Sequence, residues 1–211
     1  MHKTAFITAL DKSKTTGHIE SMPRVSLREN ILESALEEFH RLGFAACSVE
    51  DITRHAGVPK GSFYNHFKSK EDLAVHVIDL YVEAAPNDIL GNTSITPLKR
   101  LKQHFGLLAQ VFIDSGFQRG CLLSNFVSEL ADHSPVVQQK LHSALAQWTE
   151  HLAKVIREGQ QSGEISSAHK AESWAGFLLS AYEGALMRTR AAKDPRPLRE
   201  FNTLALTLLA A

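Results

Sequence analysis

The sequence of 211 residues has little of what several protein classes need. It carries no net formal charge, because 23 basic residues balance 23 acidic ones, so charge alone would not hold the whole chain on DNA or on an anionic membrane. Its two cysteines, Cys47 and Cys121, are too few for a disulfide framework. Every apolar run falls short of the ~20 residues of a membrane span. We therefore expect a cytoplasmic protein that has no membrane partner.

The signatures of common enzymes are also missing. The sequence contains no glycine-rich phosphate loop, no nucleophile elbow and no zinc-type spacing of cysteine and histidine. Glu129, Asp132 and His133 can in principle share a metal ion, but they lie on one short segment without a second cluster. We expect no cofactor and no metal. An enzyme with Cys121 as its nucleophile is the weakest alternative.

What the sequence does contain is helical periodicity along most of its length. Apolar residues, 44% of the total, recur every three or four positions, and no stretch alternates as a strand would. The pattern predicts an all-α fold that follows a flexible N-terminal arm over residues 1–25. The predicted helices span residues 26–42, 49–56, 60–67, 70–85, 97–116, 121–130, 135–163, 170–193 and 197–209.

One stretch, residues 48–70, has a more specific pattern than the rest. Ser48 opens it with the spacing of a capping box, and Gly57 supplies the conformational freedom of a tight turn between two short helices. Phe63 and Phe67 then fall on one face of the second helix and leave its other face polar. This arrangement is typical of a helix-turn-helix unit.

The local charge of this stretch differs from that of the whole chain. From residue 53 to residue 70 the charged side chains are four positive and none negative. Short hydrogen-bond donors on an exposed helix can reach base edges, and lysines can neutralise phosphates, so the stretch predicts DNA recognition. The alternative is a helical hairpin with a solvated polar face. The polar face consists of Lys60, Ser62, Tyr64, Asn65 and His66.

The motif S-V-x-D-I at 48–52, followed by A-G-V-x-K-G-S-F-Y-x-H-F-x-S-K-E-x-L at 56–73, resembles the DNA-binding signature of TetR-type transcriptional regulators. The resemblance implies a homodimer with an N-terminal three-helix DNA-binding domain over 26–72. A larger ligand-binding and dimerisation domain follows over 73–211, and the last two helices of each subunit form the dimer interface. The predicted DNA-binding residues are Ser48, Thr53, Lys60, Gly61, Ser62, Tyr64, Asn65, His66 and Lys70.

The same resemblance implies a function. A regulator of this type is a repressor that binds a palindromic operator on double-stranded DNA as a dimer and is released by a small-molecule inducer. The rival function is a helical dimerisation protein without ligand sensing, which keeps the helix-turn-helix only for packing. Operator binding distinguishes the two.

Two interpretations of Cys121 remain open. A nearby helix N-terminus and Arg119 can lower the pKa of the thiol, whereas apolar neighbours raise it and favour simple packing. Residues 117–122 resemble one subgroup of TetR-type regulators that responds to reactive or unsaturated compounds, including acrylate-like acids, aldehydes and quinones. We favour a non-covalent ligand whose carboxylate can pair with Arg119. The predicted ligand-binding residues are Cys121, Arg119, Phe105, Phe112, Phe126, Trp148 and Trp174.

Overall fold

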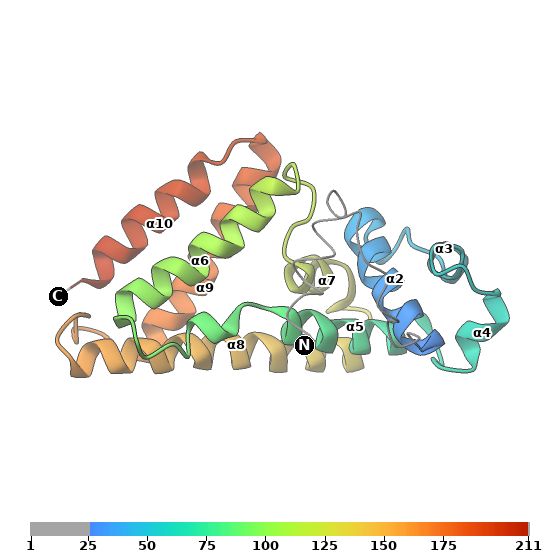
Figure 1. Cartoon of the computed structure of the whole chain (residues 1–211), viewed down its shortest axis with the longest axis horizontal. Coiled ribbons are helices and arrows are strands. Elements are labelled where there is room, and N and C mark those ends of the chain that lie inside the picture. The colour runs from blue at the N-terminus through green and yellow to red at the C-terminus, as the bar shows by residue number, and fades with distance from the viewer. Residues whose placement is uncertain (1–25, 211) are drawn as a thin grey trace, which may run out of the picture. The chain divides into compact units, whose positions relative to one another are not determined.

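The computed structural model describes residues 26–210, and these form helices joined by short turns (Figure 1). Apart from one antiparallel bridge between Ile165 and Ala210, this part of the chain contains no β-structure. The all-α prediction is confirmed. The α-helices are α2 (Leu27–Leu42), α3 (Val49–His55), α4 (Lys60–Tyr64), α5 (Lys70–Ala84), α6 (Pro97–Asp114), α7 (Leu122–Leu130), α8 (Pro135–Gln161), α9 (Ala171–Ala192) and α10 (Arg196–Leu209), and the short 3-10 helix η1 spans Asn87–Ile89.

The helices begin at the capping residues that the sequence indicates. Ser26 and Ser48 cap α2 and α3 through complete capping boxes, and the Ser69 hydroxyl accepts a hydrogen bond from the backbone N–H of Asp72 in α5. The prediction that α4 reaches residue 67 is wrong. The chain leaves the helix at Asn65 and turns, because Ser69 must open α5 shortly afterwards.

The described residues pack as two compact units, and the first comprises residues 26–85 and Asn125–Leu141. In this unit α2 packs against α3, α4 and α5. Phe39 lies edge-on to Phe126, with ring centroids 5.4 Å apart, while Phe63 and Phe67 are buried at 5.7 Å from each other. Because α4 is far shorter than the ~12 residues that an isolated helix needs, the burial of these two phenylalanines is what holds it in place.

The turn between α2 and α3, residues 43–47, is held by two charged side chains from other helices. The Lys70 ammonium donates to the carbonyl oxygens of Phe44 and Cys47, each at 2.8 Å, and lies 4.2 Å from the centroid of the Phe44 ring. The Glu129 carboxylate accepts from the backbone N–H of Ala45 at 2.8 Å. We call this segment the α2–α3 turn. Peptide groups that helices leave unpaired are thus satisfied by side chains.

Gly43 is required at the start of the α2–α3 turn for two reasons. Its φ of +80° lies in the region that favours glycine. A Cβ atom added at this position would also come within 3.0 Å of Glu129 Oε1. The turn therefore admits the Glu129 carboxylate only because residue 43 has no side chain.

The second unit comprises residues 86–124 and 142–210. Within it α9 and α10 lie side by side, and α10 also packs on α6 (Figure 1). Three aromatic rings join these helices: Phe105 of α6, Tyr182 of α9 and Phe201 of α10 have centroids between 5.1 and 5.6 Å apart. This aromatic cluster is the core of the second unit.

A buried histidine extends this core toward α8. Trp148 Nε1 donates to His104 Nε2 at 3.1 Å, so neutral His104 carries its proton on Nδ1, which faces the Pro86 carbonyl oxygen at 3.3 Å. Burial lowers the pKa of His104 to about 4, against a smaller opposite effect of the Pro86 hydrogen bond. The histidine is therefore a neutral link between helices at physiological pH.

Replacing Lys70 by methionine should destabilise the protein, because the change keeps an apolar stem and removes the donor to two carbonyl oxygens. We expect a loss of about 1–3 kcal/mol in the free energy of unfolding, measured by urea denaturation. Lys68→Met, at an exposed position in the same segment, should change stability by less than about 0.5 kcal/mol. Equal effects of the two substitutions would contradict the anchoring role of Lys70.

Acidification should destabilise the second unit through His104. Its folded pKa of about 4 lies below the ordinary 6.5, so the unfolded chain binds the proton more readily, and stability present above pH 6.5 is lost as the pH falls toward 4. Urea denaturation from pH 7 to pH 4.5 should show a loss of up to about 3 kcal/mol from this group. His104→Gln keeps an acceptor for Trp148 and does not titrate, so its stability should fall less over the same range; an identical fall would argue against this assignment.

Candidate nucleic-acid interface and ligand site

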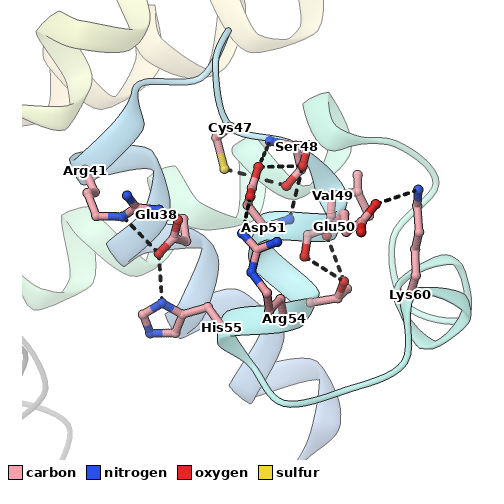
Figure 2. A network of polar contacts seen from close by, with 11 residues as sticks. Glu38, Arg41, Cys47, Ser48, Val49, Glu50, Asp51, Arg54, His55 and Lys60 are labelled. Carbon is pink, nitrogen blue, oxygen red and sulfur yellow. Dashed lines mark hydrogen bonds and ion pairs between the residues drawn. The ribbon is translucent and has the colours of Figure 1, made fainter.

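The helix-turn-helix pair consists of α3, the turn at Gly57 and α4. Gly57 has a φ of +67°, and the backbone N–H of Val58 donates to the Thr53 carbonyl oxygen at 3.0 Å, which closes the turn. At the start of α3 the Ser48 hydroxyl accepts from the backbone N–H of Asp51 at 3.1 Å. Hydrogen bonds from Ser48 hold the pKa of Asp51 at about 2. The predicted capping box is confirmed (Figure 2).

One face of α4 and of the turn after it is exposed. Tyr64 is 60% exposed, and its ring meets only the edge of Phe63 among the ring contacts described. A Cβ atom added at Gly61 would meet nothing within 4 Å, so the fold of this unit does not itself require glycine there. Of the predicted DNA-binding residues, those in α4 and in the turn after it that lie exposed are Lys60, Gly61, Tyr64, Asn65 and His66, and Ser48 is exposed at the start of α3.

Other residues from the predicted set have structural contacts. Thr53 is only 2% exposed, and its hydroxyl donates to the Val49 carbonyl oxygen at 3.0 Å. The expectation that Lys70 lies on the exposed face is wrong, because its ammonium is turned to the carbonyls of the α2–α3 turn. Ser62 is half-buried, and Ser48 uses its hydroxyl in the cap. Direct DNA contacts stay predictions for these four residues and for the five exposed ones of α4 and of the turn after it.

Acidic residues from the first turn of α3 lie beside the basic residues of the unit (Figure 2). Asp51 pairs with Arg54, and Glu50 lies 3.7 Å from the Lys60 ammonium. Such exposed pairs contribute little to stability, so a phosphate can displace the acid at small cost. The positive charge counted from residue 53 to residue 70 is thus partly balanced in the folded unit.

A polar network fixes α3 against α2 (Figure 2). The Glu38 carboxylate is almost completely buried, binds Arg41 and lies 2.8 Å from His55 Nδ1. The hydrogen bond from Arg41 lowers the pKa of Glu38 despite its burial, with His55 acting in the same direction. Glu37 lies 3.2 Å from the other nitrogen of His55. The orientation of α3 therefore depends on paired charges as well as on apolar packing.

The aromatic residues predicted to line the ligand site do not all lie together. Phe105 and Trp148 both contact Tyr182, with centroids 5.2 and 6.2 Å from its ring. Phe112 faces Phe117 at 6.0 Å. The remaining two lie elsewhere: Phe126 packs on Phe39 and Phe44 in the first unit, and Trp174 packs with His169 and Phe177 near the start of α9. Their contact with a ligand stays a prediction.

Cys121 lies buried in the second unit beside Ser124 and Glu183. The thiol donates to the Glu183 carboxylate, and its sulfur accepts from Ser124. Burial raises the pKa of Cys121 to about 12, and the Glu183 charge acts in the same direction. Arg119 is not among the largest influences on this pKa. These influences disfavour a thiolate and agree with the predicted effect of apolar burial, and the reactivity of Cys121 stays a prediction.

Sequence reasoning missed the groups that surround Cys121. Ser124 donates to Glu183 Oε2 at 2.6 Å, and Tyr182 is close enough that Glu183 and Cys121 raise the pKa of its hydroxyl in addition to the effect of burial. One signal was available, since Glu183 is an isolated acid in the apolar stretch from residue 174 to residue 187. An acid in an apolar stretch is a candidate functional group, because burial of an acid shifts its pKa and requires a partner.

No group of three or more histidine, cysteine, aspartate and glutamate side chains in residues 26–210 is arranged to hold a metal ion. None of the helices in this range combines the length and the apolarity that crossing a membrane requires.

Comparison with known proteins agrees with the signature and with the fold. The family model described as "Bacterial regulatory proteins, tetR family" matches residues 31–77, and "Tetracyclin repressor-like, C-terminal domain" matches residues 97–205. The HTH-type transcriptional repressor DhaR of Mycobacterium sp. (strain GP1) is 33% identical over 89% of this chain and 94% of its own length. The transcriptional regulator AcuR of Cereibacter sphaeroides is 30% identical over 88% of this chain and 86% of its own length.

A solved structure has the same architecture. The crystal structure of regulatory protein TetR from Rhodobacter sphaeroides superposes with a TM-score of 0.81 and 28% identity, covering 88% of this chain and all of that one. The helix-turn-helix signature, the all-α architecture and these matches lead to the same conclusion: the chain belongs to the TetR family of bacterial regulatory proteins, which are ligand-responsive DNA-binding transcriptional regulators.

Proposed function

We propose that the protein is a repressor that binds a palindromic operator as a homodimer and leaves it when a small-molecule inducer binds. Residues 26–72 read the DNA, and residues 73–211 bind the inducer and dimerise. The observation that carries this proposal is an exposed polar surface over the buried Phe63 and Phe67. It is formed by Lys60 and Tyr64 of α4 and by Asn65 and His66 of the turn after it. The name of the relative DhaR supports repression as the sign of regulation.

The physical basis of release is that both half-sites must be contacted together. Two recognition helices of a dimer meet successive major grooves about 34 Å apart, so an inducer that changes their separation lowers operator affinity. The inducer is a small compound, with reactive or unsaturated compounds as the first to test. The rival function, helical dimerisation without sensing, predicts no operator at all.

Dimerisation through the last two helices is supported by an exposed apolar face. Phe177 and Met187 of α9 and Leu204 and Leu208 of α10 are each about half exposed or more. Phe177 and Met187 are ten residues apart, close to three helical turns, and Leu204 and Leu208 are four apart, so each pair lies on one side of its helix. Because α9 and α10 pack together, the two sides offer apolar surface for a second copy.

The function is tested by selecting bound DNA from a random duplex library with the full-length protein. We expect a palindrome with half-sites about one helical turn apart. Release of that duplex is then followed by fluorescence anisotropy with a panel of small acids, amides and electrophiles. A protein that enriches no sequence would contradict the proposal.

Tyr64→Ala should weaken operator binding at least about tenfold, since a single DNA contact is worth roughly 1–3 kcal/mol. Lys60→Ala should lower the dependence of log affinity on log salt by about 1, because one phosphate contact is lost. Lys99→Ala, at an exposed position on α6, is the control and should do neither. Anisotropy titrations at several salt concentrations, with thermal unfolding to check stability, give the result. Wild-type affinity in both Tyr64→Ala and Lys60→Ala would refute the DNA-reading role of α4.

Met187→Glu and Leu204→Glu should convert the dimer to monomers, because each places a charge on the proposed dimer face. Sedimentation equilibrium should show the loss of dimer at micromolar concentration, and operator affinity should fall with it. Val136→Glu changes an equally exposed apolar residue at the start of α8 and should leave the dimer intact. If the two variants remain dimeric, the interface lies elsewhere.

A further inference from the structure

The second unit contains a largely buried carboxyl group, one of whose oxygens has no hydrogen-bond partner. Glu183 Oε2 accepts from the Ser124 hydroxyl at 2.6 Å, and the Cys121 thiol also donates to this carboxyl group, while no described residue forms a hydrogen bond with the buried Oε1 atom. A buried polar atom without a partner costs free energy, and such atoms are uncommon in folded proteins. The unsatisfied oxygen therefore needs an explanation beyond packing.

The surroundings of Glu183 disfavour the binding of an anionic ligand. Its neighbours are the Cys121 thiol, the Ser124 hydroxyl and the Tyr182 side chain, none of which is a cation. Burial is the largest cause of the raised pKa values of Glu183, Cys121 and Tyr182, and the charge of Glu183 raises those of Cys121 and Tyr182 further. An anion placed here would meet both a low dielectric and the carboxyl group.

Tyr182 connects this polar group to the aromatic cluster. Its ring lies against Phe105, Trp148 and Phe201, while its hydroxyl interacts electrostatically with Glu183 and Cys121. A ligand that forms a hydrogen bond with Glu183 Oε1 would thus lie near Tyr182, which belongs to the aromatic cluster. Sites for small molecules commonly combine these features.

We propose that Glu183 Oε1 is the polar recognition point for the inducer, and that the inducer class is an uncharged compound with adjacent donor and acceptor groups, as in a primary amide. An amide satisfies Oε1 in either protonation state, since its N–H donates to a carboxylate and its C=O accepts from a carboxylic acid. A carboxylate repels the ionised form and lacks a donor. This deepens the proposed function and rests on it for the consequence of binding, although the selectivity itself is measured without DNA.

The test compares two pairs of nearly isosteric compounds on the full-length protein by isothermal titration calorimetry at pH 7. Propanamide and propanoate differ in charge and donor but are unreactive, and acrylamide and acrylate repeat the comparison with an alkene. Each amide should bind at least about tenfold more tightly than its acid. Glu183→Gln should reduce that ratio to within about threefold. Glu172→Gln, which removes an exposed carboxylate on the same helix, should leave the ratio unchanged.

Several outcomes overturn the proposal. It fails if the acids bind as well as the amides, if propylammonium binds more tightly than propanamide, if none of the four compounds binds the wild type, or if Glu183→Gln keeps the full preference. The wild-type ratio decides the matter even if Glu183→Gln does not fold. If the proposed function is wrong, the ligand-free protein binds no operator, although calorimetry still shows the preference for amides over acids. The two failures are therefore distinguishable.

Discussion

The position of the DNA-reading helices depends on the α2–α3 turn, whose peptide groups have no helical partners. Lys70 donates to two of its carbonyl oxygens, and Glu129 accepts from one of its N–H groups. The peptide groups of the turn thus stabilise two charged side chains from other helices. Helices as short as α3 and α4 are unstable in isolation. Three sets of contacts fix their orientation: those of this turn, the network of Glu38 with His55, and the packing of the buried Phe63 and Phe67. The exposed polar face of α4 is a consequence of those contacts.

The helices were predictable because the signals that start and stop them are local. Ser26, Ser48 and Ser69 cap the helices that follow, and Gly57 adopts the positive φ that its turn needs. The partner of a long side chain is not a local property. Lys70 was expected to face solvent, yet it finds its acceptors 23 and 26 residues earlier in the chain, and no spacing rule indicates that contact. Phe126 has core-like helical spacing, and spacing cannot say which of the two units its ring enters.

Counting charges along the sequence also has a limit set by folding. Residues 53–70 contain only positive charged side chains, but the helix brings Asp51 to Arg54 across one turn, and tertiary packing brings Glu50 near Lys60. The resulting surface attracts phosphate less strongly than the count suggests. In the second unit the sequence count instead understates the effect of one charged residue. Glu183 contributes one charge to the sequence total, yet in its largely buried place it raises the pKa values of both Cys121 and Tyr182 in addition to the effect of their burial.

The chemistry of Cys121 follows from burial and from the nearby Glu183 carboxyl group. A thiol and a carboxyl group that share a hydrogen bond in a buried place cannot both ionise, because each negative charge opposes the other. The carboxyl group has the lower intrinsic pKa and therefore takes the charge first, which leaves the sulfur protonated and a poor nucleophile. A reactive thiolate would need a cation strong enough to outweigh both burial and Glu183, and Arg119 is not among the largest influences on the sulfur. Recognition by hydrogen bonding and shape therefore suits this cluster better than covalent capture, and the carboxyl group that suppresses the thiolate is the one that selects against anionic ligands.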